Sequence, residues 1–219
     1  MALTFNPVGD FELVADGLEA HTLRERDGVE YLLTKVLRQE VDRKEVWASN
    51  GQYRSGDAVF HLSTTEHATE PSLGAVLVTA AAEEFTVLAV VKDTMGDRWE
   101  CIGRNLGVTE GLTDRGTIQV AGEPEQDASG HIRPIMWHDE FTEVVARLQV
   151  DAGERLVEHG QTVFIQRGTC VFLLPKEIDA TRRIKQADGT VWKIVRVGKK
   201  DRIDVLFEAE VEQTPWPSL

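Results

Sequence analysis

The sequence predicts a mainly β protein made of two tandem small β-barrel or β-sandwich domains with little helix. Three observations predict this fold class. Short segments of alternating apolar and polar residues recur along the chain, turn residues such as Asn-Gly and Asp-Gly separate them, and a pattern in the first half returns in the second. Short strands at regular intervals are typical of barrels and sandwiches, and a repeated pattern indicates a duplicated unit.

The repeat consists of two echoes. Residues 56–62 are echoed by residues 168–174, an offset of 112 from position 56 to position 168. Residues 85–90 are echoed by residues 192–197, an offset of 107 from position 85 to position 192. Two offsets that differ by the length of a loop indicate a tandem duplication of one β-module. We therefore expect an N-terminal β-module over residues 1–107 and a C-terminal β-module over residues 108–219.

In the first half, residues 17–26 alternate weakly, Asp27-Gly28 is a turn signal, and residues 29–33 form the return strand. An alternative is a helix within residues 29–43, where Leu32, Leu33 and Val36 follow a helical spacing. The further strands expected in this half are residues 57–62, 75–79, 85–91 and 98–104.

The second half opens with a strand at residues 116–120, and a polar loop at residues 121–130 follows. Asp188-Gly189 predicts a hairpin turn. The prolines in residues 214–219 argue against a strand there. The further strands expected in this half are residues 142–150, 162–166, 169–174, 190–197 and 204–211.

The overall charge disfavours some functions. The chain has 37 acidic and 24 basic residues, a formal net charge of −13, which opposes tight binding to nucleic-acid phosphates. We find neither a long apolar run of the kind that spans a membrane nor a secretory signal at the start of the sequence. Cys101 and Cys170 fall in expected strands of different modules, which predicts two buried thiols and no disulfide between them.

The densest group of metal-ligand residue types is Trp137-His138-Asp139-Glu140, with His131 upstream. Consecutive residues of an extended segment point to opposite sides, so this group favours a solvated loop over a metal site. His61 and His67 flank a strand end, and Leu173 stands where the other echo has His61. We predict no catalytic, cofactor-binding or metal-binding residues, no cofactor, and no enzymatic activity.

Five aromatic residues recur at matching places of the two modules: Phe60, Phe85, Trp99, Phe172 and Trp192. Aromatic residues within alternating strands most often fill the core, although a platform for sugars or peptides is the alternative. Trp47 and Trp216 lie outside the strongest strands and are better candidates for contact with a partner protein.

The second half resembles the phage head-tail joining family, also called adaptor or head-completion proteins. The resemblance lies in residues 117–119, the loop that follows, residues 135–139 leading to residues 145–148, the Asp-Gly turn before residues 190–195, and the alternating residues 201–210. It covers residues 116–212 and, more faintly, residues 17–104. Members of that family carry one module, whereas this chain carries two.

The resemblance implies a non-enzymatic structural protein of a phage or prophage particle. Such a protein would assemble through protein contacts, with portal, adaptor or tail components and with itself in a ring. It would be a virion component made in the host cytoplasm, with no tight nucleic-acid binding and no membrane association. Exposed strand edges and the loops at residues 50–56 and 121–130 could make the ring contacts. The alternative is a carbohydrate- or peptide-binding β-module of a tail or cell-surface assembly.

Overall fold

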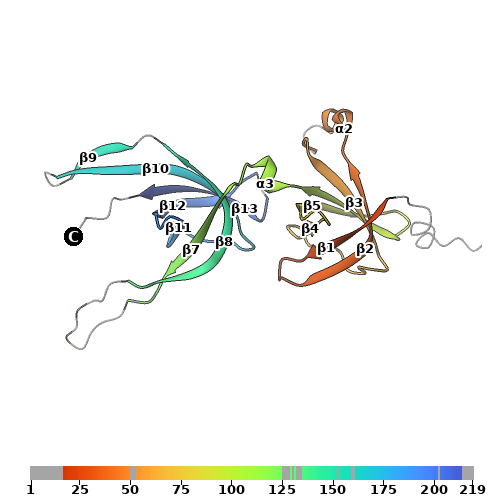
Figure 1. Cartoon of the computed structure of the whole chain (residues 1–219), viewed down its shortest axis with the longest axis horizontal. Helices are drawn as coiled ribbons and strands as arrows, with labels where there is room; N and C mark the ends of the chain where they lie inside the picture. Colours follow the sequence, from red (N-terminus) through yellow and green to blue (C-terminus); the bar gives the residue numbers. More distant parts are fainter. Residues whose placement is uncertain are drawn as a thin grey trace, which may run out of the picture. The chain divides into compact units, whose positions relative to one another are not determined.

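The structure, a computed structural model, describes residues 17–49, 53–124, 129, 131, 135–151, 153–158, 161–201 and 203–213. The chain divides into two compact units, Met1–Thr109 and Glu110–Leu219. Each unit is built on a closed antiparallel barrel, and helix is confined to α2 (Arg43–Ala48) and α3 (Leu106–Thr109) among the described residues (Figure 1). The predicted fold class, two tandem small β-barrels with little helix, is confirmed. Within the described residues, neither helix is long and apolar enough to cross a bilayer.

Barrel 1 closes in the order β1-β2-β3-β6-β5-β4, and β4 pairs back onto β1. Its strands are β1 (Leu18–Arg24), β2 (Glu30–Glu40), β3 (Asp57–Ser63), β4 (Val76–Val78), β5 (Glu84–Lys92) and β6 (Arg98–Arg104). The β1–β2 turn forms at Asp27-Gly28, as the sequence predicts. Gly28 adopts a left-handed φ of 88°, and Asp27 Oδ1 accepts a hydrogen bond of 3.0 Å from Val29 N.

Barrel 2 closes in the order β7-β8-β10-β13-β12-β11, and β11 pairs back onto β7. Its strands are β7 (Asp114–Ala121), β8 (Trp137–Val150), β10 (Gln161–Leu173), β11 (Arg182–Gln186), β12 (Val191–Lys199) and β13 (Leu206–Gln213). A further strand, β9 (Glu154–Glu158), pairs with the first part of β10. The predicted Asp188-Gly189 turn joins β11 to β12, with Asp188 Oδ1 accepting from Thr190 N at 2.8 Å.

The two barrels have the same strand order and matching registers. Successive strands of barrel 1 correspond to β7, β8, β10, β11, β12 and β13. In barrel 1 Leu77 pairs with Leu23 and Phe85, and in barrel 2 Ile184 pairs with Ile118 and Trp192. The match extends through the other ladders and differs only along β7–β8, where the register shifts fall at other residues. We call two residues equivalent when they hold the same place in these ladders.

An irregularity of the sheet is repeated as well. In β5 the register shifts between Val87 and Ala89, and in β12 it shifts between Ile194 and Arg196. The extra residue is therefore Leu88 in barrel 1 and Val195 in barrel 2. A β-bulge bends a strand and increases its local twist, so both barrels turn at the same point of the same strand.

One of the two sequence echoes matches the strand pairing of the two barrels, and the other does not. The echo of offset 107 lies on β5 and β12 and is in register. The echo of offset 112 lies on the corresponding strands β3 and β10, but the ladders make Cys170, not Phe172, equivalent to Phe60, which is an offset of 110. A slip of two residues keeps the same side chains pointing inward, so the alternation of the sequence does not detect it.

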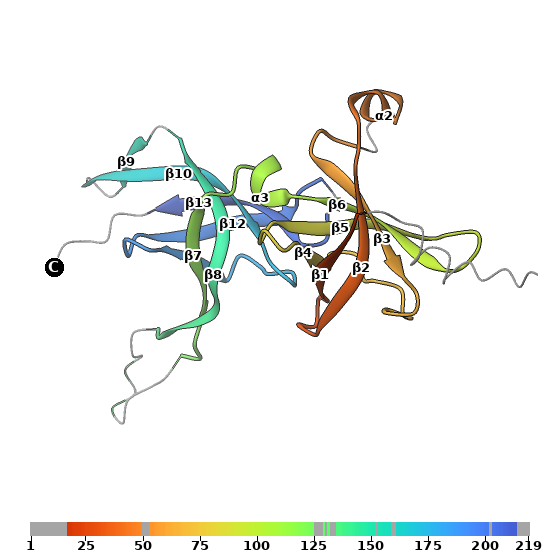
Figure 2. The same cartoon turned by 45° about the vertical axis from the view of Figure 1, so that its right-hand side comes forward.

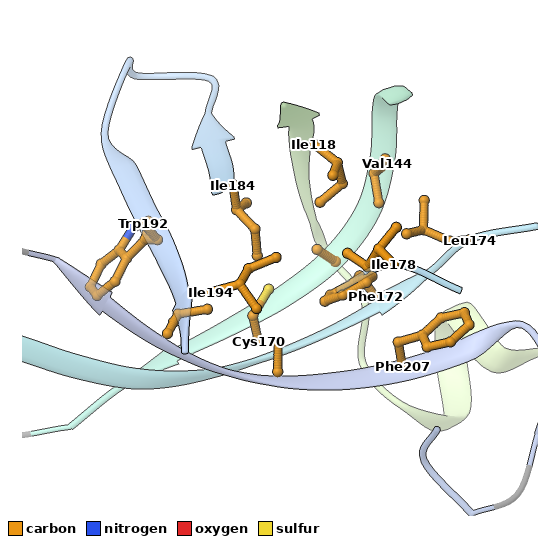
Figure 3. Packing of buried hydrophobic residues seen from close by; sticks show 13 residues of the cluster. Ile118, Val144, Cys170, Phe172, Leu174, Ile178, Ile184, Trp192, Ile194 and Phe207 are labelled. Carbon is orange, nitrogen blue, oxygen red and sulfur yellow. The ribbon is translucent and has the colours of Figure 1, made fainter. Parts of the chain in front are cut away.

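The five aromatic residues assigned to the core are buried, with Phe60 and Phe172 both fully inaccessible. Figure 3 shows the interior of barrel 2, where Cys170 and Phe172 of β10, Ile184 of β11, and Trp192 and Ile194 of β12 belong to one buried cluster. In barrel 1 the corresponding cluster includes Phe60, Phe85 and Trp99. The aromatic platform considered as an alternative is therefore wrong for these five residues.

Other expectations are corrected. The helix considered within residues 29–43 is the strand β2, and the helix lies just after it as α2. The two strands expected at residues 162–166 and 169–174 are one strand, β10, and β9 was not expected. The solvated loop at Trp137–Glu140 is the start of β8. The tail at residues 214–219 lies outside the described residues.

Candidate interaction surfaces

The residues that suggested a metal site make contacts with three basic or amide side chains. On β8, Asp139 Oδ1 accepts a hydrogen bond from Gln119 Nε2 at 2.6 Å. Glu140, the next residue, contacts Arg182 Nε and Lys176 Nζ, both at 2.9 Å. Hydrogen bonding to Arg182 lowers the pKa of Glu140 below its ordinary value. The part of the chain that the structure describes contains no group of three His, Cys, Asp or Glu placed to hold a metal ion.

The two candidate histidines of barrel 1 lie among packed side chains. His67 is buried, and its carbonyl oxygen accepts a hydrogen bond of 2.9 Å from Trp99 Nε1. The His67 ring lies edge-on to Tyr31, with the centroids 4.7 Å apart. Burial lowers the pKa of His61 below its ordinary value, and the nearby Arg98 lowers it further. These contacts hold the β3–β4 connection against the barrel.

Both cysteines are buried free thiols in strands, as the sequence predicts. Burial raises the pKa of Cys101 to about 12 and that of Cys170 to about 12. A thiol that stays protonated is a poor nucleophile, so these residues act as small apolar side chains of the core.

Trp47 is the most exposed large apolar side chain of the described residues, at 86%. It lies on α2, which stands away from barrel 1 in both views (Figures 1 and 2). The helix begins with a capping box: Asp42 Oδ1 accepts from Glu45 N at 2.8 Å, and Glu45 Oε2 accepts from Asp42 N at 3.0 Å. The Asp-x-x-Glu spacing was visible in the sequence and could have located this helix. Trp216, the other candidate for partner contact, lies outside the described residues.

A two-stranded ribbon extends from barrel 2. It consists of β9 and residues 161–165 of β10, which pair only with each other among the described residues. Both views show it reaching away from the barrel (Figures 1 and 2). Its outer edges therefore carry backbone groups without a ladder partner, which a strand of another chain can use. Each barrel is closed, which leaves its sheet without an edge strand, although some segments, such as residues 137–145 of β8, have a ladder partner on one side only among the described residues.

Helix α2 and the ribbon occupy corresponding places in the two barrels. The helix lies in the connection between β2 and β3, and the ribbon lies in the connection between β8 and β10. Each barrel is thus elaborated at the same connection, in one case by an exposed tryptophan on a capped helix and in the other by an open-edged ribbon. Of the two loops expected to make contacts, residues 50–52, 125–128 and 130 lie outside the described residues.

A groove of about 670 Å³ lies on barrel 2, lined by side chains from the start of β8 and from β11, β12 and β13. Trp137, Arg183, Lys193 and Glu212 are among its lining residues. Arg183 pairs with Lys193, and Lys193 pairs with Glu212, so these three form a cross-strand row. The neighbouring Ile184, Trp192 and Ile194 are buried, which places the row on the outer face of the sheet.

Arg183 is held in a defined position in this groove. Its guanidinium carbon lies 4.1 Å from the centroid of the Trp137 ring, within the range of a cation–π contact. Its Nε donates a hydrogen bond of 2.8 Å to Gln119 Oε1, and the same Gln119 donates to Asp139. Residues from β7, β8 and β11 thus position one cation. No linear motif marks the groove, because its residues come from separate strands.

No protein-family model and no curated protein sequence matches the chain. A chain from the solved virion of a native gene transfer agent (GTA) particle is similar to it, with 17% sequence identity and a TM-score of 0.39. The similarity covers 47% of this chain and 94% of that chain. A TM-score of 0.39 is too low to carry an argument about fold or function.

Proposed function

We propose that this chain is a non-enzymatic structural protein of a phage or prophage particle, a head-tail connector or completion component that assembles through protein contacts. The observation that carries the proposal is that two closed barrels of matching register each bear one projecting element at the same connection. Closure leaves the barrels without an edge strand, so the β9–β10 ribbon is the main site for strand addition from another chain, and α2 offers an exposed tryptophan for a second contact.

The sequence resemblance over residues 116–212 supports the same assignment. The duplicated topology fits a protein in which one chain supplies two copies of a module that the family carries singly. The formal net charge of −13 is compatible with a component beside which DNA passes without being bound. The expected location is the virion, after synthesis in the host cytoplasm.

The ribbon is the element that the assembly model depends on most. An isolated two-stranded ribbon is marginally stable in water, and a strand added from a neighbouring chain would complete its hydrogen bonds. We therefore expect the ribbon to be more stable in the assembly than in the isolated chain.

The test is assembly of the purified protein, alone and with portal rings from the same genome, followed by light scattering and negative-stain electron microscopy. We expect rings or portal-bound complexes for the natural chain. A variant in which residues 154–164 are replaced by a short Gly-containing turn should lose them, because the barrel pairing of β10 with β8 and β13 starts beyond that segment. Trp47→Ala should weaken them with no loss of folding, because the side chain is 86% exposed.

Leu32→Ser is a matched control for Trp47→Ala, because Leu32 is also exposed, at 73%, but lies on a barrel strand. Particles that form equally well without the ribbon and without Trp47 would contradict the proposal. So would a chain that stays monomeric with portal rings present.

The second candidate is a peptide-binding module of a tail or cell-surface assembly. The groove beside Trp137 favours it, because it combines a stacked arginine with a second cation on a concave face. An array of glycans and peptides separates the candidates: binding without any assembly would favour the module.

A further inference from the structure

Two cations of the groove, Arg183 and Lys193, form no ion pair with described residues, whereas several other basic residues of barrel 2 do. Arg182, Lys199 and Lys200, for example, each contact carboxylates at 2.6–3.4 Å. Neither Arg183 nor Lys193 forms an ion pair with any described residue, although they pair directly across β11 and β12. Arg183 and Lys193 therefore place two positive charges side by side in a chain with 37 acidic and 24 basic residues, and Glu212 is the one carboxylate among the described lining residues.

The surroundings of Arg183 make a counter-charge favourable. Burial lowers the pKa of its guanidinium below the ordinary value, so the charge is partly desolvated. Gln119 and Trp137 orient the group but do not neutralise it. A carboxylate that reaches the groove would offset the desolvation and form charge-assisted hydrogen bonds.

We propose that this groove binds an extended acidic segment of a partner protein, with carboxylates at alternate positions meeting Arg183 and Lys193. This inference rests on the proposed function, since it gives the chemistry of one partner of the assembly. Alternate residues of an extended peptide lie about 6.6–7 Å apart on one side, close enough to address two side chains on neighbouring strands. An aliphatic or aromatic residue of the segment can cover the exposed part of Trp137 at the same time.

Charge favours a protein segment over nucleic acid as the occupant. Only two unpaired cations line the described groove, and the formal net charge of −13 would repel a polyanion that extends beyond it. A short acidic peptide presents its charge within the groove alone.

The experiment measures fluorescence anisotropy of a labelled octaglutamate peptide titrated with the full chain at low and at physiological salt. Labelled octalysine and octathymidylate are the comparison probes. We expect octaglutamate to bind and octalysine not to bind. The double variant Arg183→Ala/Lys193→Ala should weaken octaglutamate binding by about tenfold or more.

The matched control is Lys185→Ala/Arg196→Ala, which removes two exposed cations from the same two strands outside the groove lining. It should change the affinity less than twofold if the site is local. Lys193→Glu alone is a second variant that leaves the Arg183 contacts in place. It should also abolish binding without altering the circular dichroism spectrum.

Equal losses in the groove variant and in the matched control would overturn the proposal, because they would indicate general charge attraction. Tighter binding of octathymidylate than of octaglutamate would also overturn it, and so would octaglutamate binding that survives Lys193→Glu. Assembly is measured separately, so particles that form without peptide binding would reject this site and leave the proposed function standing.

Discussion

Barrel 1 and barrel 2 share their ladders but place opposite charges at one pair of equivalent positions. In barrel 1, Asp57 on β3 faces Arg104 on β6. In barrel 2, the equivalent residues are Arg167 on β10 and Glu212 on β13, so the acid and the base have exchanged strands. The first pair is buried, with side-chain exposures of 0% and 6%, and the second is at the surface, with 24% for Glu212 and 54% for Arg167.

The difference shows that the same strand framework accommodates a buried ion pair in barrel 1 and an exposed ion pair in barrel 2. Arg104 makes two hydrogen bonds of 2.7 Å to the Asp57 carboxylate, which also accepts from Arg54 N at 2.8 Å. In barrel 2 the charged atoms are 3.8 Å apart. Loss of one partner from a buried pair leaves an uncompensated charge, whereas an exposed pair is screened by water.

The largest expected effect therefore comes from Asp57→Asn. We expect it to destabilise barrel 1 by about 3–5 kcal/mol, because Arg104 would keep a buried charge without its counter-ion. Glu212→Gln, the equivalent change in barrel 2, should cost about 0–1 kcal/mol. Denaturation followed by hydrogen exchange measures each barrel separately. Equal losses in the two barrels would break the comparison.

The second effect concerns core volume. A Cβ added to Gly103 would lie 2.7 Å from Phe60 Cε2, and barrel 2 has Val211 and Cys170 at the equivalent positions. We expect Gly103→Val to destabilise barrel 1 by about 1–3 kcal/mol through overpacking.

The double variant Phe60→Cys/Gly103→Val copies the pair of barrel 2 and should recover part of the loss of Gly103→Val. The two changes should be non-additive by about 0.5–3 kcal/mol, because the residues are in contact. A double-mutant cycle in chemical denaturation measures the coupling, and strict additivity would contradict the equivalence of the two cores.

The third effect is a pH dependence that buried histidines give to barrel 1. His21 is buried against Phe60, with ring centroids 5.6 Å apart, and its equivalent in barrel 2 is Gly116. Burial lowers the pKa of His21 below 6.5, against opposing contributions from Glu19, and Arg38 lowers it further. The unfolded chain therefore binds the proton more readily, so stability is present above pH 6.5 and is lost as the pH falls below it.

The loss is expected to reach about 1.4 kcal/mol for each pH unit between the unfolded and the folded pKa of this group. His61, whose pKa is also lowered by burial, should add to it. His21→Leu should flatten the profile of barrel 1 in hydrogen exchange, while the profile of barrel 2 stays unchanged. An unaltered slope in the variant would exclude His21 as the cause.

The smallest expected change in stability comes from reversing the exposed pair, Arg167→Asp/Glu212→Arg, at about 0–1 kcal/mol. The reversal should nevertheless change how the chain refolds. If β3 paired with β13, Asp57 would face Glu212, and Arg167 would face Arg104 in the reciprocal pairing, so the natural charges oppose strand exchange between two barrels of matching register. The reversed variant removes this repulsion.

We expect a larger fraction of exchanged oligomers after refolding of the reversed variant, measured by size-exclusion chromatography. Arg167→Lys/Glu212→Asp keeps the natural signs and is the control. Equal oligomer fractions in the two variants would show that the charges do not select the pairing.

Much of the architecture was predictable from the sequence, and particular residues show why. Alternation located β3, β5 and β6, Gly28 and Gly189 marked two turns that need a left-handed residue, and aromatic residues within alternating strands identified the cores. The echo on β5 and β12 was in register because a bulge at the same position is part of the repeated pattern. The groove and the charge-exchanged pair were not predictable, since their members come from strands that only the closed sheet brings together.

By itself, therefore, the sequence determined that there are two β-modules, where most of their strands run, and which side chains point inward. Only the tertiary structure decided the register, the closure of both barrels and the two projecting elements. The physical reason lies in the period of a strand. A slip of two residues leaves the inward face unchanged, so the choice between an offset of 110 and one of 112 depends on how Phe60 fits beside Gly103 and how Cys170 fits beside Val211.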